Sequence, residues 1–152
     1  MNPQQTEILR DIIHRMMARY MTIRPLGIDL GNSRKLIPAL NCRVLNYGAA
    51  RTLYQQRRPI CRSLDAVTAL GDSKKHCQQC LDRKHCTGQV RLELLFENSP
   101  YRLLLAYTSA KNFLLYTGKL AEQKLEIQTI DTKIIVVNRG SWGELLFLRA
   151  DM

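Results

Sequence analysis

Four of the five cysteines of this chain fall close together, and their spacing constrains the fold more than any other feature. They are arranged as Cys61-x15-Cys77-x2-Cys80-x5-Cys86. Two residues between a pair of cysteines let the backbone turn so that both sulfurs face one ion, and a second pair completes a tetrahedron with sulfur about 2.3 Å from zinc. The intervening residues are poor in apolar side chains, so coordination would supply the free energy that folds them. We predict one structural zinc ion per chain.

Other uses of these cysteines fit the sequence less well. No signal peptide is recognisable, so we expect a cytoplasmic protein, in which reduced thiols disfavour disulfides. A redox role for the Cys-x2-Cys pair is disfavoured by the two additional cysteines. An iron–sulfur cluster also takes four cysteines and stays open as an alternative. His76 and His85 each adjoin a ligand cysteine and can replace it, although with four thiols we expect them outside the coordination shell.

The predicted metal site is not catalytic, because four thiolates leave no position for a reactive water. The sequence contains no deaminase motif, phosphate-cradling glycine-rich loop, Ser–His–Asp arrangement or carboxylate cluster. We therefore expect a protein that is not an enzyme and has no small-molecule substrate. The fifth cysteine, Cys42, lies among Leu40, Val44 and Leu45 and is expected to be a small buried hydrophobe.

Positive charge is concentrated in the N-terminal part of the chain. Residues 1–91 hold 16 Lys and Arg against 6 Asp and Glu, whereas residues 92–152 hold 7 of each. The whole formal net charge of +10 therefore lies in the part that includes the cysteines. Such a one-sided field attracts polyanions, with nucleic acid the first candidate and an anionic membrane surface the second. A solvated basic face that keeps the protein soluble is the simplest alternative. We expect nucleic acid as the partner and no membrane.

Basic residues around the cysteines are expected to contact phosphates, which adds affinity without reading sequence. Tyr47 and Tyr54 lie in the same basic half and can stack on unpaired bases, at ~1–3 kcal/mol per base. A core or rim position is the alternative for each tyrosine. The candidate nucleic-acid-binding residues are Arg43, Tyr47, Arg51, Tyr54, Arg57, Arg58, Arg62, Lys74, Lys75, Arg83 and Lys84.

Residues 5–20 carry apolar side chains at helical spacing and predict an amphipathic helix. Such a stripe usually packs on the protein's own core. The alternative is that Ile8, Ile12 and Met16 bind a protein partner or a second copy of the chain.

The rest of the sequence predicts mostly strands. Alternating apolar and polar residues indicate a hairpin, then a helix and further strands. Trp142 precedes the last strand and is expected to close one end of the fold, with base stacking as the alternative. The expected elements are a strand within 36–47, strands at 90–97 and 101–107, a helix at 110–123, and strands at 125–130, 132–137 and 143–148.

This order favours a mainly β (α+β) fold. We predict an OB-like small barrel with a helix between its third and fourth strands, an N-terminal helix and an inserted four-cysteine zinc segment. An α+β sandwich of the same elements is the alternative. One domain over residues 1–152 is expected, made of an N-terminal helix (1–21), a basic β/loop region (22–60), the zinc-binding segment (61–89) and a β-hairpin–helix–β half (90–152).

Several motifs occur in a characteristic order. Cys61-x-Ser63-x-Asp65 opens the cysteine segment, the other three cysteines follow, and Trp142-Gly143 begins the last strand. On these motifs, residues 58–148 resemble a group of small phage, plasmid and mobile-element proteins. That group carries a Cys-x-Ser-x-Asp-Gly … Cys-x2-Cys … Cys zinc segment before an OB-like half, although Ala66 stands here where glycine is usual. The resemblance implies single-stranded DNA binding in replication or recombination.

The sequence thus predicts a non-enzymatic zinc protein that binds single-stranded DNA through a basic groove. Duplex DNA and RNA are less favoured ligands. The alternative is an adaptor subunit of a larger nucleoprotein complex, which would dock a partner through residues 5–20.

Overall fold

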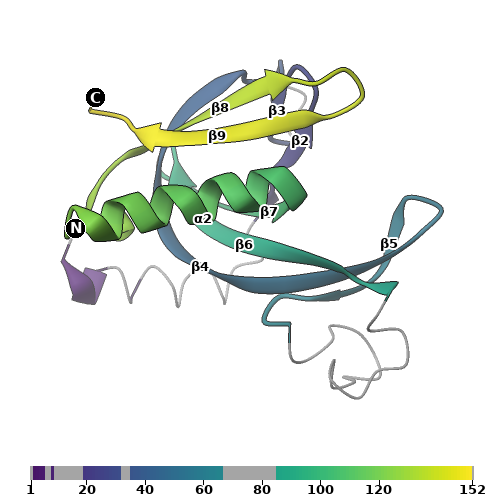
Figure 1. The fold of residues 1–152 in the computed structure, drawn as a ribbon, viewed down its shortest axis with the longest axis horizontal. Coiled ribbons are helices and arrows are strands. Elements are labelled where there is room, and N and C mark those ends of the chain that lie inside the picture. Colours follow the sequence, from purple (N-terminus) through teal and green to yellow (C-terminus); the bar gives the residue numbers. More distant parts are fainter. Residues whose placement is uncertain (1, 6–7, 9–18, 32–34, 67–84, 152) are drawn as a thin grey trace.

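The computed structural model describes residues 2–5, 8, 19–31, 35–66 and 85–151. These residues form a mainly β structure with one long helix (Figure 1). The elements are β1 (Arg19–Tyr20), β2 (Thr22–Arg24), β3 (Gly27–Asp29), β4 (Ala39–Gln55), β5 (Arg58–Ser63), β6 (Thr87–Phe96), β7 (Ser99–Ala106), α2 (Tyr107–Glu122), the 3-10 turn η3 (Ile127–Thr129), β8 (Thr132–Asn138) and β9 (Gly143–Arg149).

Strand β4 is 17 residues long and pairs with three others. Its first residues pair with β8, its middle pairs with β6, and its last residues pair with β5. The register with β6 shifts between Val44 and Asn46, which leaves Leu45 as an extra residue. Such a bulge bends and twists a strand, so β4 curves from one sheet neighbour to the next (Figure 1).

The main sheet is mixed and has the order β1-β7-β6-β4-β8-β9, with β5 attached to β4. Its strands are antiparallel except for β1, which runs parallel to β7. Among the described strands the sheet does not close into a barrel, because β1 and β9 end the order without pairing to each other. The coarser prediction of a mainly β, α+β fold is confirmed.

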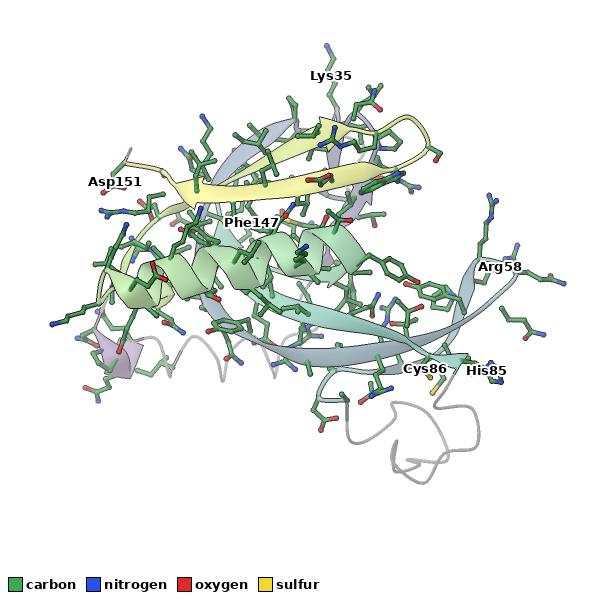
Figure 2. The ribbon with its side chains drawn as sticks, viewed as in Figure 1. Lys35, Arg58, His85, Cys86, Phe147 and Asp151 are labelled. Atoms are coloured by element: carbon green, nitrogen blue, oxygen red, sulfur yellow. The ribbon has the colours of Figure 1, made fainter. Side chains whose placement is uncertain are left out.

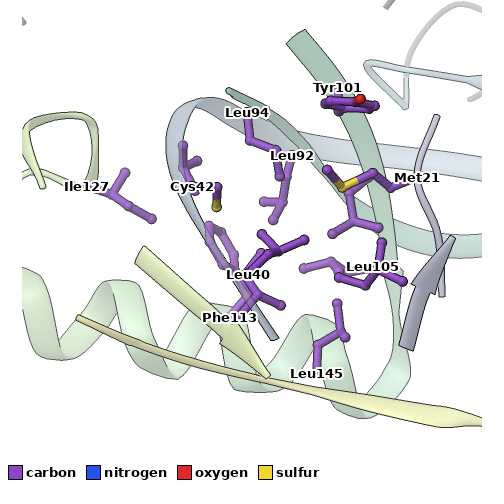
Figure 3. Close-up of a cluster of buried hydrophobic side chains, with 14 of the residues drawn as sticks. Met21, Leu40, Cys42, Leu92, Leu94, Tyr101, Leu105, Phe113, Ile127 and Leu145 are labelled. Atoms are coloured by element: carbon purple, nitrogen blue, oxygen red, sulfur yellow. The ribbon is translucent and has the colours of Figure 1, made fainter. Parts of the chain in front are cut away.

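Helix α2 connects β7 to β8 and packs on β9, β7 and β6. Its buried side chains are Ser109, Phe113, Tyr116 and Leu120. Phe113 is at the centre, with its ring edge-on to those of Tyr47 at 5.1 Å and Phe147 at 5.2 Å. Residues of β4, β6 and β7, of β8 and β9, and of the helix therefore share one core. Figure 3 shows part of it, including Met21, Leu40, Cys42, Leu92, Leu94, Tyr101, Leu105, Phe113, Ile127 and Leu145.

Cys42 is buried in this core, as predicted. Burial raises the pKa of its thiol to about 12, with a smaller contribution from the charge of Asp131. The thiol therefore stays protonated at neutral pH and is a poor nucleophile or metal ligand.

The predicted hairpin, helix and last two strands agree with β6–β7, α2, β8 and β9. The strand expected at 125–130 is wrong, because this stretch contains the turn η3. The hydroxyl and amide of Thr129 both donate to the carbonyl of Glu126, a local bonding pattern that competes with strand pairing. Ile127 is buried as the apolar anchor of the turn.

The last two residues of the helix expected over residues 5–20 are not helical in the structure. Arg19 and Tyr20 form β1, paired with Tyr101 and Arg102 of β7. Residues 9–18, which carry most of the predicted stripe, lie outside the described ranges.

Candidate nucleic-acid interface

A cavity of about 890 Å³ lies where α2 begins. Its walls come from parts of the chain that are far apart in sequence: residues 20–25, the β4–β5 arm, the β6–β7 hairpin, the first turn of α2, and the residues before β9. In Figure 1 the β4–β5 arm extends past the start of α2, on the side toward which the β8–β9 turn also points. The cavity thus joins the two halves of the sheet at one end of the molecule.

Gly143 allows the wall formed by residues 20–25 to approach closely. A Cβ atom at this position would lie 2.5 Å from the carbonyl oxygen of Arg24 and 3.1 Å from Val136. The backbone of β2 therefore packs directly on the start of β9. This explains why glycine follows Trp142 here.

Three strongly exposed aromatic side chains line the cavity. Tyr54 is 42% exposed, Trp142 45% and Tyr107 79%. They come from β4, the β8–β9 turn and the start of α2. The ring-to-ring contacts among described residues join core aromatics, and none of them involves these three rings. Each ring is therefore available to a ligand.

Tyr107 has an unusual backbone conformation, with φ +49° at the junction of β7 and α2. This left-handed region is unfavourable for a bulky side chain, at a cost on the order of 1–3 kcal/mol. A strained and highly exposed aromatic residue in a cavity wall is more typical of a binding site than of a structural turn.

Arg62 of β5 is fixed in the cavity wall by an aromatic neighbour. Its guanidinium carbon lies 4.7 Å from the ring centre of Tyr20, and that of Arg102 lies 5.7 Å from the same ring. These are cation–π distances. The Nε atom of Arg62 is buried and has no hydrogen-bond partner within the described structure. An anion reaching this side chain would meet a positioned guanidinium.

A short chain of hydrogen bonds forms another part of the cavity wall. The hydroxyl of Thr52 donates to Oε1 of Gln89 at 2.6 Å, and Nε2 of Gln89 donates to the hydroxyl of Tyr54 at 3.3 Å. Gln89 is 9% exposed, so these bonds fix the orientation of a buried carboxamide.

Three arginines and one carboxylate lie on the face of the sheet that lines the cavity. In the strand registers Arg62 lies opposite Thr52, Thr52 opposite Thr87, and Glu93 opposite Arg102, so Arg62, Arg91, Glu93 and Arg102 point to one side. Glu93 is fully buried, with its Oε1 3.3 Å from Nε of Arg91 and 3.6 Å from a terminal nitrogen of Arg102. The face therefore keeps an excess of positive charge.

The N-terminus of α2 adds further positive potential to the cavity. Its N-cap residue Ala106 offers no side-chain hydrogen bond, and the first turn contains no acidic residue. The first amide groups of a helix lack partners within the helix and carry the positive end of its dipole.

The structure brings two of the predicted nucleic-acid residues, Tyr54 and Arg62, into this cavity. Tyr47 instead lies on the core side of β4, against Phe113. Arg43 is engaged in an ion pair with Asp131 at 2.8 Å and also donates to the carbonyl of Gln128.

The other predicted binding residues lie elsewhere. Arg51 is half-buried on β4, while Arg57 and Arg58 are exposed at the tip of the β4–β5 hairpin, where Figure 2 labels Arg58. Ile8 of the predicted partner surface is exposed. The predicted residues that lie outside the described ranges are Ile12, Met16, Lys74, Lys75, Arg83 and Lys84.

The structure describes two of the four predicted zinc ligands. Cys61 of β5 lies opposite Leu53 of β4. Cys86 immediately precedes Thr87 of β6, which pairs with Thr52 of β4. Figure 2 shows Cys86 beside His85 at the start of β6. These two cysteines thus flank neighbouring positions of β4, at the two ends of the connection that contains Cys77 and Cys80. Those two lie outside the described ranges, and the described residues alone contain no metal-binding group of three or more ligands.

Sequence reasoning missed Gln89, Arg91, Glu93, Arg102 and Tyr107. The alternation of polar Gln89, Arg91 and Glu93 with apolar residues along β6 was the available signal, since it marks a polar second face of the sheet. No comparable signal distinguished Tyr107, because its importance comes from its backbone angle and exposure.

Comparisons of the chain with protein-family models, with curated proteins and with solved structures gave no match. In the described ranges no helix combines the length and apolarity needed to cross a bilayer.

We predict that Glu93→Gln lowers the free energy of unfolding by about 3–5 kcal/mol, because it leaves the guanidinium groups of Arg91 and Arg102 buried without a counter-charge. Equilibrium urea unfolding measures the change. The matched control is Glu122→Gln, the same chemical change at an exposed position of α2, which is expected to stay within about 0.5 kcal/mol of the parent. Equal stability of the two variants would contradict a structural role for the buried carboxylate.

Proposed function

We propose that this protein is a non-enzymatic, zinc-containing nucleic-acid-binding protein that binds single-stranded DNA through a basic groove. The observation that carries the proposal is the cavity at the start of α2, where Arg62 and three exposed aromatic rings line one hollow. Cationic side chains that track phosphates and aromatic rings that stack on bases are the two components of single-strand binding sites.

Single strands are favoured over duplex because the rings expose faces on which unpaired bases can stack. Exposed faces of Tyr54, Tyr107 and Trp142 can stack only on bases whose own faces are uncovered. Bases of a duplex are already stacked on their neighbours. A phosphate-binding surface without rings would not make this distinction.

The order of elements supports the same function. Strands β4, β6 and β7, then α2, then β8 and β9 follow the order of an OB-fold, in which the first strand is long and pairs with both the second and the fourth. OB-folds bind oligonucleotides on the second and third strands and on two neighbouring loops. The corresponding strands here are β6 and β7, and the residues before β9 line the cavity. We propose an OB-like arrangement in which β7 and β9 do not pair with each other.

We propose that the zinc ion is bound by Cys61, Cys77, Cys80 and Cys86. Cys61 and Cys86 stand at the two ends of the cysteine segment, and the guanidinium of Arg91 donates to the carbonyl of Leu64 at its beginning. A thiolate-bound ion would tie the segment to β5 and to the start of β6, because Cys61 lies in β5 and Cys86 directly precedes β6. On the resemblance of this segment to mobile-element proteins, we further propose a role in replication or recombination.

We predict that Arg62→Gln weakens binding of a fluorescein-labelled single-stranded DNA about tenfold, since a charge-assisted hydrogen bond to phosphate is lost. Fluorescence anisotropy over a salt series measures the affinity. The dependence of log K on log salt is expected to become shallower by about 0.7, the value for one phosphate of a single strand.

The control for this experiment is Lys119→Gln, which removes the same charge from the last turn of α2, about 18 Å along the helix from Tyr107. Its affinity is expected to match the parent. Loss of affinity in both variants alike, salt-independent binding, or tighter binding of the duplex than of the single strand would contradict the proposal.

For the metal, we predict one zinc ion per chain by elemental analysis of the purified protein, and loss of that zinc in Cys61→Ser. Cys42→Ala is the matched control, because Cys42 is buried in the core with a protonated thiol and should leave the zinc content unchanged. Iron in place of zinc, or full zinc content in Cys61→Ser, would contradict the proposed site.

A further inference from the structure

We infer that the cavity at the start of α2 holds an unpaired nucleotide, with its base in contact with both Trp142 and Tyr107 and its phosphate on Arg62. This inference rests on the proposed function and deepens it, because it assigns one built pocket to the base itself. From the sequence, Trp142 is expected to close one end of the fold, with base stacking as the alternative, and Tyr107 is not singled out.

Tyr54, Tyr107 and Trp142 come from three separate elements, yet all line the same cavity. Large aromatic side chains usually become buried on folding, because burial removes apolar surface from water. Tyr101, Phe113 and Tyr116 follow that rule and are buried in the core, whereas the three cavity rings stay exposed. Their free faces match those of a planar ligand.

The backbone that carries Tyr107 and Trp142 is held in place by packing. The left-handed backbone of Tyr107 stands at the start of a 16-residue helix, which packs on β9. The backbone next to Trp142 is also held in place, because Gly143 lets β2 pack closely on the start of β9. Rings on such supports lose little further freedom when a base binds, so more of the stacking energy appears as affinity.

Polar groups of Gln89 and Arg62 line the cavity together with the rings. Gln89 uses one lone pair of Oε1 for Thr52 and one hydrogen of Nε2 for Tyr54, which leaves one acceptor and one donor position without a partner in the described structure. A base edge carries donors and acceptors that such a carboxamide can pair with, whereas an alkyl chain does not. Arg62, held against Tyr20, supplies the charge for the adjoining phosphate. Together these groups suit a nucleotide better than a purely apolar ligand.

Trp142 is the single tryptophan of the chain, so its fluorescence reports this pocket directly. The full-length protein is titrated with a short single-stranded DNA, and with the same strand in which every base is replaced by an abasic residue. Anisotropy of an end label follows binding independently of the tryptophan. We expect the intact strand to quench Trp142 emission along the same curve as the anisotropy. The abasic strand should bind at least about fivefold more weakly and leave the emission unchanged.

Tyr107→Gly separates binding from folding. Glycine adopts a positive φ without strain, so the melting temperature of this variant should equal or exceed that of the parent, while DNA affinity falls about fivefold or more. Leu115→Ala is the control, since it truncates another exposed residue of α2 outside the cavity and should not change affinity.

The outcomes distinguish the pocket from the function. Binding seen by anisotropy with unchanged Trp142 emission and equal affinity for the abasic strand would overturn the nucleotide pocket and leave the proposed function standing. An unchanged affinity of a folded Tyr107→Gly protein would also overturn it. Absence of any anisotropy change at low salt with either strand would reject the proposed function itself.

Discussion

The pairing of β4 with three strands is the constraint on which the rest of the structure depends. One end of β4 holds β8, its middle holds β6, and its other end carries β5. The bulge at Leu45 lets β4 change direction between its pairing with β8 and its pairing with β6, because the extra residue increases the local bend and twist. The β6–β7 and β8–β9 hairpins, held at different parts of β4, both contribute to the core that α2 covers.

The two faces of the β4–β6–β7 sheet have different roles. On one face Leu92, Leu94 and Leu103 join the core under α2. On the other, the buried carboxylate of Glu93 neutralises part of the charge of two arginines and keeps them in place. Arg62 contacts the ring of Tyr20 and forms no ion pair with any carboxylate that the structure describes, so its charge remains available at the cavity. The structure thus separates charge used for stability from charge that can bind a polyanion.

Sequence periodicity was sufficient for the regular parts of the fold. The alternation along β6 and β7 and the apolar positions of α2 are properties of single elements, and the predicted hairpin and helix are confirmed. It could not supply strand registers, because each bulge exchanges the two faces of a strand. Tyr47 and Tyr54 looked alike in the sequence, yet one contacts Phe113 and the other lines the cavity. The stretch at 51–55 has no clear alternation of apolar and polar residues, and its pairing with β5 and β6 makes it a strand. The zinc site remains a prediction from cysteine spacing.

The central claim is that nucleic acid binds at the end of the molecule where the β4–β5 arm, the start of α2 and the β8–β9 turn meet. Amide chemical shifts, recorded by NMR as single-stranded DNA is added to the zinc-loaded protein, test it most directly. The account predicts the largest shifts at Tyr20, Arg62 and Ser109 and at the indole of Trp142, with little change at Lys119 or Leu146. Shifts centred on the outer surface of α2 and β9, with the cavity residues unmoved, would contradict it.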